Sequence, residues 1–269
     1  MKTKNLEAEL TCETDYFSAR QDGSVVIFRP KGNQLLSSSI LKIKEAILRY
    51  FELVVEHSEA RIILLMPSRR KAQNEEYLLF FDMLRSSRIS ENNVMRLYRA
   101  IDQLIMNIIA SDLFFISADY GRILPMFAGI SLACDYRILG EDAVFQNPGV
   151  ELGLIPKGGI AWFLTRILGK GKALEMIIAK ESLSASEALT LGLVNRCIPI
   201  KNFETDSLSI AKQFETIPET TLKLGKKVVN NCWKDLSEFL EFESQELFKV
   251  VHRRHFYGEP SVEPSIQRA

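Results

Sequence analysis

Two compact apolar segments most constrain what this chain can fold into. They are Arg61–Met66 (RIILLM), which stops at Pro67, and Leu113–Ala118 (LFFISA). Runs this short and this apolar are typical of strands buried on both faces of a parallel sheet. A β-rich segment, Ser24–Arg29, precedes them, and apolar residues recur at helical spacing over Ile40–Val54. A strand, a helix and a parallel strand make one right-handed crossover unit, so the sequence predicts an α/β fold.

The rest of the chain divides into an α/β part and a helical part. Helices are expected over Glu75–Leu84, Ser90–Ala110 and about Met126–Ala133, strands at Tyr136–Leu139 and Ala143–Phe145, and a Gly/Pro-rich loop over Pro148–Gly159. From Trp162 on the chain is expected to be mostly helical apart from Leu193–Ile198, with helical periodicity at Ala211–Gln213, Leu222–Val229 and Leu236–Val251. We therefore expect an α/β core over residues 1–199 and a C-terminal helical region over 200–269.

Composition narrows the class of protein. Of 269 residues, 46% are hydrophobic, and 34 basic residues balance 34 acidic ones. Zero net charge gives no reason to expect nucleic acid as a partner. The N-terminal stretch has no apolar region typical of a signal peptide, and no apolar run approaches the ~18–20 residues that span a membrane. Four widely spaced cysteines and three histidines form no zinc or disulfide pattern. We expect a cytoplasmic protein with reduced thiols, no metal and no membrane partner.

Many ordered motifs between Phe127 and Pro199 resemble one known group of proteins. They are Ala133-Cys134-Asp135-Tyr136-Arg137-Ile138, Ala143-Val144-Phe145, Leu152-Gly153-Leu154-Ile155-Pro156, Leu168-Gly169 with Lys172-Ala173-Leu174-Glu175-Met176, Leu183-Ser184-Ala185-Ser186-Glu187-Ala188 and Gly192-Leu193-Val194-Asn195. In this order and spacing they are similar to the crotonase (enoyl-CoA hydratase/isomerase) superfamily.

The resemblance implies a fold, a substrate and an assembly. The fold would be a spiral of ββα units whose helical C-terminal region makes trimer contacts, giving a homotrimer or a hexamer built as a dimer of trimers. The substrate would be an acyl thioester of coenzyme A or of a carrier protein, and coenzyme A would enter as part of the substrate rather than as a separate cofactor. Two backbone N–H groups would form an oxyanion hole that stabilises an enolate made from the thioester carbonyl.

The acids that hydratases of this superfamily use are absent from this sequence. Counted back from Cys134-Asp135, the family's glycine turn falls on Pro125-Met126-Phe127 and its first catalytic glutamate on Gly129. The second glutamate normally follows a proline, but here Pro148 is followed by Gly149. Without either carboxylate, addition of water to a double bond has lost its proton-handling groups.

The oxyanion donors are the backbone N–H groups of Met126 and, by resemblance, of Tyr77. The family's glycine-containing segment after the strand near Met66 is replaced by Pro67 to Tyr77, which holds no glycine. Backbone donors survive a side-chain change, but bulkier residues restrict how closely a thioester approaches the backbone.

Two ionisable residues are candidates for catalysis. Lys157 falls where some isomerases and a dehalogenase of the superfamily place an aspartate, so we expect a general acid or charge stabiliser there; the alternative is a solvated lysine in a loop. Asp119 ends a buried strand, and the carboxyl ends of parallel strands line sites in α/β folds. Its alternative role is to accept hydrogen bonds from backbone donors.

Four further residues are candidates for substrate binding. Arg69, Arg70 and Lys71 follow a strand end and could contact the phosphates of coenzyme A or of a carrier arm, or lie in a solvated turn. Trp162 could line an acyl pocket or pack in the core.

Two hypotheses follow. In the first, which we favour, the protein is an acyl-thioester isomerase, decarboxylase or lyase that uses the oxyanion hole without hydration. In the second it is a non-catalytic relative that keeps the fold for thioester binding or assembly.

Overall fold

The computed structural model describes residues 10–31, 40–57, 59–67, 79, 83, 86, 90–147, 150, 155–179 and 182–257. Its larger sheet has seven strands in the order β1-β2-β3-β4-β5-β7-β10, and from β3 to β10 all neighbours are parallel. Their bounds are β1 (Cys12–Glu13), β2 (Phe17–Asp22), β3 (Val25–Pro30), β4 (Ile62–Leu65), β5 (Phe114–Asp119), β7 (Tyr136–Gly140) and β10 (Arg196–Ile198). The buried parallel strands predicted from the apolar runs are confirmed.

A second sheet of three strands lies beside the first. It consists of β6 (Arg122–Ile123), β8 (Val144–Gln146) and β9 (Ser182–Ser184), with β6 parallel and β9 antiparallel to β8. The strand β9 was not predicted, because Ser182–Ser184 is too short and polar to give a strand pattern. The N-terminal strands β1 and β2 were also not predicted.

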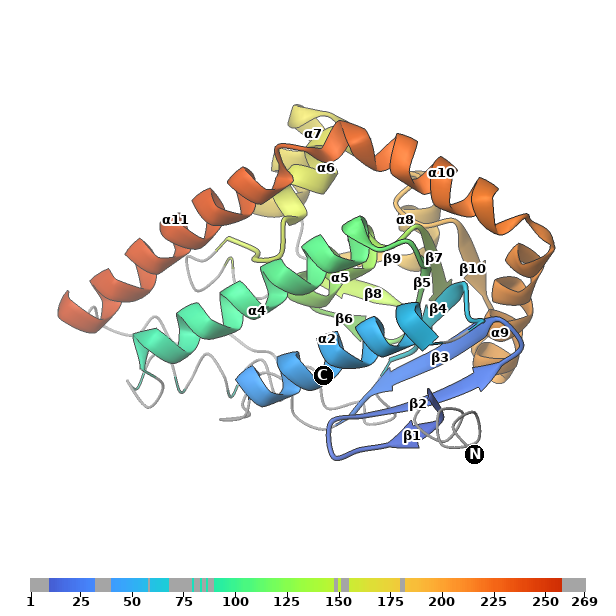
Figure 1. Cartoon of the computed structure of the whole chain (residues 1–269). Coiled ribbons are helices and arrows are strands. Elements are labelled where there is room, and N and C mark those ends of the chain that lie inside the picture. The colour runs from blue at the N-terminus through green and yellow to red at the C-terminus, as the bar shows by residue number, and fades with distance from the viewer. Residues whose placement is uncertain are drawn as a thin grey trace.

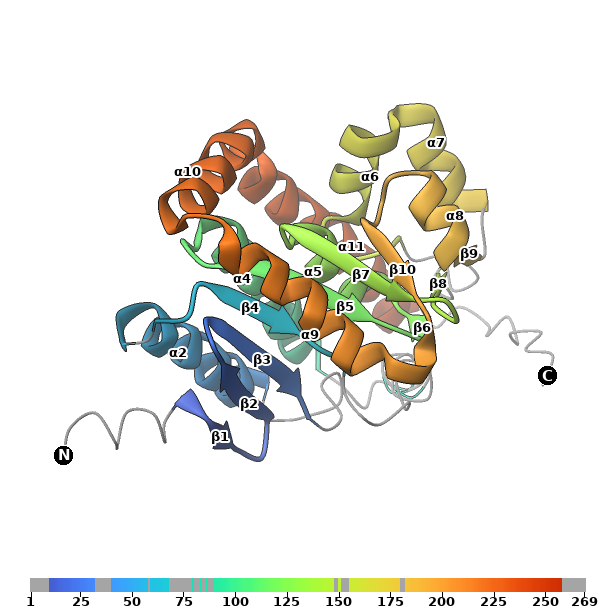
Figure 2. The ribbon, with the colours of Figure 1, turned by 90° about the vertical axis from the view of Figure 1, so that its right-hand side faces the viewer.

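Helices cover both faces of the larger sheet, as Figures 1 and 2 show. The helical segments are α2 (Ile40–His57), α4 (Glu91–Ala110), α5 (Pro125–Ala133), α6 (Ile160–Leu168), α7 (Lys170–Leu174), the π-helical η1 (Glu175–Ala179), α8 (Ala185–Thr190), η2 (Ile200–Asn202), α9 (Phe203–Gln213), η3 (Phe214–Thr216), α10 (Glu219–Asn230), η4 (Asn231–Trp233) and α11 (Leu236–Tyr257). Alternate residues of each strand serve the two faces. In β3, Val26 and Phe28 pack toward α2 and α4, whereas Val25 and Ile27 pack toward α9.

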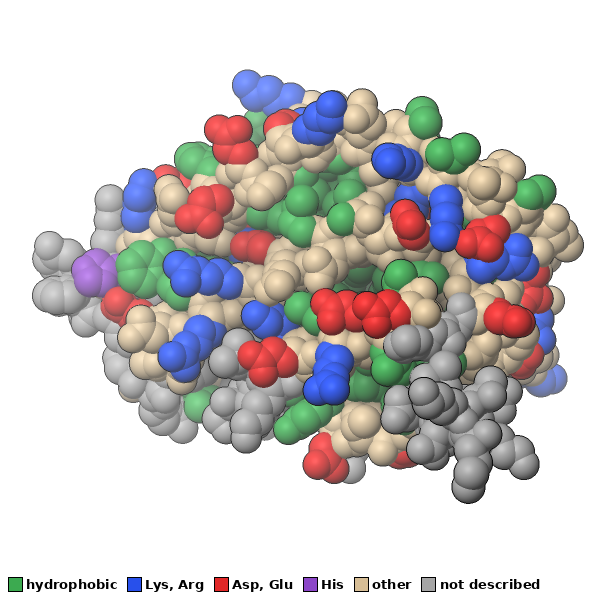
Figure 3. All heavy atoms as spheres, viewed as in Figure 1, with side chains coloured by type: hydrophobic (Ala, Val, Ile, Leu, Met, Phe, Trp, Pro, Cys, Tyr) green, Lys and Arg blue, Asp and Glu red, His purple; other side chains and the backbone are tan. Residues whose placement is uncertain are grey.

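The C-terminal helices pack onto the core of their own chain. In Figure 1, α11 runs alongside α4, and its residues Leu236, Leu240 and Leu247 are buried in the main core. These three leucines are therefore covered within one chain, and the contact of the C-terminal region with a partner subunit, which the resemblance implies, stays a prediction. Exposed apolar side chains of this region include Val228 of α10, which is 74% exposed, and Phe242 of α11, which is 57% exposed. In Figure 3, separate hydrophobic side chains lie at the surface over α10, in the upper right of the view.

A buried ion pair between Asp135 and Lys226 holds several elements together. Asp135, directly before β7, accepts a hydrogen bond from the Phe115 backbone N–H at 2.7 Å and pairs with the buried Lys226 Nζ of α10 at 2.8 Å. Lys226 Nζ also donates to the carbonyl oxygens of Ile108 and Leu113, each at 2.7 Å. This lysine satisfies one carbonyl group in the last turn of α4, that of Ile108, and one directly before β5, that of Leu113. The Cys134-Asp135 motif is thus part of the scaffold that positions α5.

Candidate functional site

The N-terminus of α5 is the centre of the candidate site. Leu124 caps the helix in an extended conformation, and Pro125 occupies the first turn, where its missing N–H costs nothing. The first N–H groups of a helix have no carbonyl partner within it and lie at the positive end of the helix dipole. Met126, which is 95% buried, supplies the first such N–H after the proline. The backbone N–H of Met126, the predicted oxyanion donor, is therefore not used by the hydrogen bonds of the helix. The other predicted donor, Tyr77, lies outside the described residues.

The loop at Gly158 packs directly against α5 at Gly129. A Cβ added to Gly129 would lie 2.0 Å from the Gly158 carbonyl oxygen and 2.8 Å from the Gly158 carbonyl carbon. Gly158 itself has a φ of 103°, a conformation that side chains disfavour. The backbone of this loop thus fills the space in which a side chain at position 129 would begin. The other lost glutamate position, Gly149, lies outside the described part of the chain.

Lys157 is buried in this loop and does not face solvent. Its side chain is only 4% exposed, and its ammonium group pairs with Asp102 of α4 and, at 3.0 Å, with Glu243 of α11. The ammonium nitrogen also lies 5.8 Å from the centroid of the Tyr98 ring. The alternative interpretation of Lys157 as a solvated loop lysine is therefore wrong.

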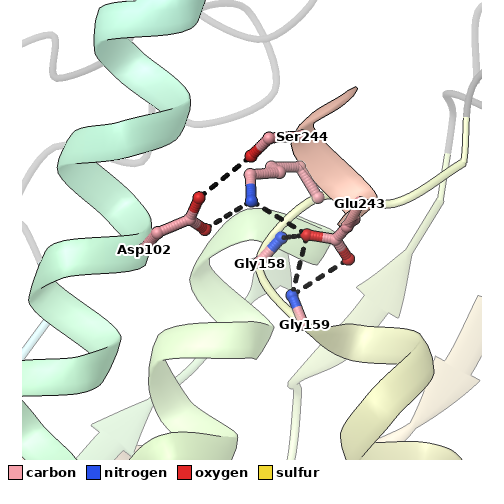
Figure 4. A network of polar contacts seen from close by, with 6 residues as sticks. Asp102, Gly158, Gly159, Glu243 and Ser244 are labelled. Atoms are coloured by element: carbon pink, nitrogen blue, oxygen red, sulfur yellow. Dashed lines mark hydrogen bonds and ion pairs between the residues drawn. The ribbon is translucent and has the colours of Figure 1, made fainter. Parts of the chain in front are cut away.

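Glu243 binds the backbone of the same loop. Its carboxylate accepts hydrogen bonds from the N–H groups of Gly158 at 3.0 Å and Gly159 at 3.1 Å. Ser244 Oγ donates to Asp102 Oδ2 at 3.0 Å, which completes the cluster in Figure 4. These contacts join α4, the loop and α11, three segments far apart in sequence. They hold Gly158 against α5.

Burial sets the protonation of the two acids in the cluster. Burial raises the pKa of Asp102 and the pKa of Glu243, and the neighbouring Lys157 lowers both only in part. Two carboxyl groups share one ammonium, so one of the two charges lacks a full counterion. Sequence analysis did not identify either acid. The signal was present, however, because Glu243 interrupts the apolar stripe formed by Leu236, Leu240 and Leu247 at helical spacing.

Asp119 lies at the end of β5, beneath α5. The residue is half-buried, and burial raises the pKa of its carboxyl to about 7, whereas a hydrogen bond with the Ser131 hydroxyl lowers it. Ser131 of α5 is in turn hydrogen-bonded to Ser117 of β5, with 2.6 Å between the two hydroxyl oxygens. Asp119 is thus linked to α5 on the side of the helix that faces the sheet. Its catalytic role stays a prediction.

Trp162 packs among other side chains of the C-terminal half. Its ring makes edge contacts with Phe163 and Trp233, with centroids 5.2 and 5.4 Å apart, and the Arg166 guanidinium lies 3.7 Å from the ring centroid. Trp162 lines neither hollow described below, so the structure favours core packing over the acyl pocket. Arg69, Arg70 and Lys71 lie outside the described residues.

Two hollows flank α5, each with a volume of about 80 Å³. One, here called the α2–α5 groove, is lined by Ile47, Leu97, Ile101, Met126 and Ile130. The other, here called the α5–α6 cavity, is lined by Pro125, Ala128, Asn147, Ile160, Leu164 and Ile177, among others. Both are mainly apolar, and the first turn of α5 contributes Pro125 to the α5–α6 cavity and Met126 to the α2–α5 groove. An acyl group whose carbonyl accepts from Met126 N–H would therefore have apolar walls on either side.

Within the described ranges, no group of three or more His, Cys, Asp or Glu side chains could hold a metal ion. The helices that the structure describes include none long and apolar enough to cross a membrane.

Comparisons with known proteins find similar sequences of one family. The sequence model of the enoyl-CoA hydratase/isomerase family matches residues 82–260. The probable mitochondrial enoyl-CoA hydratase of Dictyostelium discoideum is 33% identical over 129 residues, which are 48% of this chain and 47% of that protein. A probable mitochondrial enoyl-CoA hydratase 2 of Arabidopsis thaliana is 26% identical over 75% of this chain and 65% of that protein. The match to the Dictyostelium protein spans about half the length of each.

Solved structures of similar proteins cover most of the chain. An enoyl-CoA hydratase from Bacillus halodurans superposes with a TM-score of 0.73 at 17% identity, covering 88% of this chain and 95% of that one. One from Bacillus anthracis gives a TM-score of 0.69 at 24% identity, covering 88% and 91% of the two chains. At these identities the likeness shows that the fold is shared, as predicted, and does not extend to the reaction.

Proposed function

Because this chain belongs to the enoyl-CoA hydratase/isomerase (crotonase) family, we propose that it binds an acyl thioester at the N-terminus of α5 and does not hydrate it. The thioester would be carried by coenzyme A or by a carrier protein. Its carbonyl oxygen would accept a hydrogen bond from the Met126 N–H, where the helix dipole favours negative charge. Similar proteins named as hydratases support the substrate class. The reaction is proposed from the residues of this chain.

The contact between Gly129 and Gly158 carries the proposal that hydration is lost. A hydratase of this family needs a carboxylate at position 129, and here a Cβ would meet the Gly158 carbonyl oxygen at 2.0 Å. The absence of the acid is thus accompanied by a loop that occupies its space. No carboxylate can reach a bound double bond from this position of α5 in the observed arrangement.

Such a site can still support reactions that depend more on stabilising an enolate than on a precisely placed base. Decarboxylation, double-bond isomerisation and carbon–carbon cleavage of a thioester all develop charge on the carbonyl oxygen, and a preorganised N–H stabilises that charge. We propose this class of reaction, isomerase or lyase in type. Asp119 stays the proton carrier proposed from the sequence, because a group with a pKa of about 7 exchanges protons at neutral pH, although Asp119 lines neither hollow.

The position of Lys157 favours a second candidate function. The cation expected to act on substrate is held by Asp102 and Glu243 and lines neither hollow. We therefore assign Lys157 a positioning role, in which it fixes the loop against α5. A protein whose best-placed cation serves structure could bind a thioester without turning it over, as a carrier or an assembly subunit.

The experiment that tests the proposal measures binding and turnover separately. Calorimetric titration with coenzyme A, butanoyl-CoA and crotonyl-CoA is expected to show thioester binding, while the enoyl absorbance of crotonyl-CoA stays constant. Met126→Pro removes this N–H in the first turn of α5, and circular dichroism checks that the variant folds. It should weaken the binding of thioesters but not of coenzyme A itself. Met126→Leu, which keeps the N–H, is the matched control. Hydration of crotonyl-CoA at rates typical of a hydratase would overturn the proposal. Decarboxylation of a malonyl-type thioester would separate the enzyme from the binding protein.

A further inference from the structure

A carboxylate from the C-terminal helix holds the turn that precedes α6. Glu243 of α11, whose side chain is 2% exposed, accepts hydrogen bonds from the N–H groups of Gly158 at 3.0 Å and Gly159 at 3.1 Å. The ammonium group of Lys157 lies 3.0 Å from the same carboxylate. Three consecutive residues, here called the Lys157–Gly159 turn, thus direct their donors at one buried anion.

The backbone of the Lys157–Gly159 turn is shaped to bind a negative charge. Gly158 and Gly159 have φ angles of 103° and 72°, and their successive N–H groups converge on one carboxylate, as in the backbone nests that bind anions. Gly159 also caps α6, and the N-terminus of a helix carries partial positive charge. The Glu243 carboxylate therefore occupies the position at which the turn favours an anion.

One face of α11 covers this turn. Leu236, Leu240 and Glu243 recur at helical spacing and share that face. A Cβ on Gly159 would lie 3.2 Å from Leu240 Cδ2 and 3.6 Å from Leu236 Cδ1, so apolar side chains lie beside the carboxylate and bury it. Hydrogen bonds to an ionised group are stronger than neutral ones, and burial excludes competing water. The contact with Glu243 therefore fixes the turn to α11.

The same turn contributes to the proposed acyl site in two ways. Pro156 and Ile160, which flank the turn in the sequence, both line the α5–α6 cavity. Gly158 packs against the first turn of α5, where a Cβ on Gly158 would lie 3.5 Å from the Met126 Cα. Movement of the turn would therefore shift one wall of the cavity and the backbone next to the proposed oxyanion donor.

We infer that Glu243 is a positioning residue for acyl binding, which acts from α11 by holding the Lys157–Gly159 turn against α5. Glu243 lines neither hollow, so it acts through the backbone of the turn. The inference rests on the proposed function, because it requires an acyl group bound beside Met126. A turn that is fixed before the ligand arrives favours binding, since less order has to be gained on association. Loss of the carboxylate should therefore weaken binding of the acyl group and leave binding of coenzyme A unchanged.

The test measures the acyl contribution to binding with and without this carboxylate. Calorimetry gives, for each protein, the dissociation constant of coenzyme A divided by that of butanoyl-CoA. Glu243→Ala is expected to lower this ratio about tenfold, because binding must then order the turn. Lys157 remains paired with Asp102 in this variant, so no charge is left buried alone, and circular dichroism checks that the variant folds. Glu238→Ala, at an exposed glutamate of α11, is the matched control and should keep the wild-type ratio.

Rescue by a free carboxylate distinguishes the positioning contact from a general loss of stability. Truncating Glu243 to alanine removes the atoms of one acetate ion, so sodium acetate should enter the vacated space and restore the ratio in Glu243→Ala. Acetamide, which has a similar shape and no charge, should not restore it, and neither should sodium chloride at equal ionic strength. Glu243→Leu fills the space without supplying an acceptor, so its lowered ratio should not respond to acetate.

The outcomes separate the inference from the proposed function. A wild-type ratio in Glu243→Ala would overturn the inference, while the proposed function would stand. A lowered ratio that acetate does not restore, or that acetamide restores equally well, would also overturn the inference. If butanoyl-CoA binds to wild type no more tightly than coenzyme A does, the proposed function falls and the inference falls with it. If Glu243→Ala does not fold, the ratio measured for Glu243→Leu decides in the same way.

Discussion

The carbonyl oxygen of Gly158 lies 2.0 Å from the place where a Cβ on Gly129 would stand. The two glycines belong to a loop and to α5, and neither tolerates a side chain without movement of the other segment. Glu243 holds the loop in this position, because its carboxylate accepts hydrogen bonds from the N–H groups of Gly158 and Gly159. Loss of an acid at position 129 and closure of the space around it are therefore one structural feature, maintained by the C-terminal helix.

We expect that a side chain at position 129 destabilises the protein and does not restore hydration. Gly129→Ala forces a Cβ into backbone atoms, and overpacking of this kind costs about 1–3 kcal/mol or more. Gly129→Glu should cost at least as much, because a carboxyl group must also be buried. Urea unfolding measures the change in the free energy of unfolding. Gly171→Ala, in α7 with nothing within 4 Å of the added Cβ, is the control and should be neutral or stabilising. A stable Gly129→Glu variant that hydrates crotonyl-CoA would contradict this expectation.

Only one side of the contact between Gly129 and Gly158, the place of Gly129 in the motif, could be predicted from the sequence. Alignment on Cys134-Asp135 placed Gly129 at the lost glutamate, because motif spacing survives in sequence. The approach of Gly158 depends on contacts among three segments, between residues that lie 55 to 142 positions apart along the chain. Local patterns carry no information on such contacts, so the loop was predicted only as a loop.

Lys157→Met should destabilise the protein strongly. It leaves Asp102 and Glu243 buried without a counterion, and removing one partner of a buried ion pair costs about 3–5 kcal/mol. Replacing an exposed loop lysine would change stability by no more than about 0.5 kcal/mol. The losses of stability expected from the two interpretations of this residue therefore differ several-fold. Chemical unfolding measures the difference. Lys201→Met, at an exposed lysine of η2, is the control. Adding Asp102→Asn and Glu243→Gln to Lys157→Met should recover part of the loss, since no charge then remains buried.

The strands and helices were predicted better than the roles of charged side chains. The runs around Ile62–Leu65 and Phe114–Asp119 are apolar on both faces, and only a central strand in a covered sheet accepts such a pattern. For Lys157, residue type and loop context can be read from the sequence, and neither distinguishes a solvated ammonium from one buried between two helices. The acids that bind it come from other elements. Trp162 was ambiguous for the same reason, because its neighbour Trp233 is remote in sequence.

The assembly predicted from the resemblance remains to be measured. A homotrimer or a hexamer is expected, and light scattering at micromolar concentration checks it. The contact would use exposed apolar residues of the C-terminal helices, which are Phe242 of α11, 57% exposed, and, on α10, Leu224 (59%), Val228 (74%) and Val229 (63%). Val228→Lys with Val229→Lys should then dissociate the oligomer without loss of helix content. Leu189→Lys on α8, 42% exposed, is the control. A wild-type monomer would contradict the prediction.

The titration of Asp119 predicts how stability depends on pH. Its folded-state pKa of about 7 is raised by burial, whereas an unfolded aspartate titrates near pH 4. Between these values the folded state binds more protons than the unfolded state, so stability falls as pH rises from about 4 to about 7. The full shift corresponds to about 4 kcal/mol, and the partial exposure of Asp119 should reduce it. Asp119→Asn removes this titration, and its stability should therefore fall less than that of wild type over the same range. Urea unfolding at pH 4.5 and 7.5 measures both proteins, with Asp112→Asn at an exposed aspartate as the control. Parallel pH profiles for wild type and Asp119→Asn would show that this carboxyl titrates normally, and Asp119 would then lose its place as the proton carrier at the end of β5.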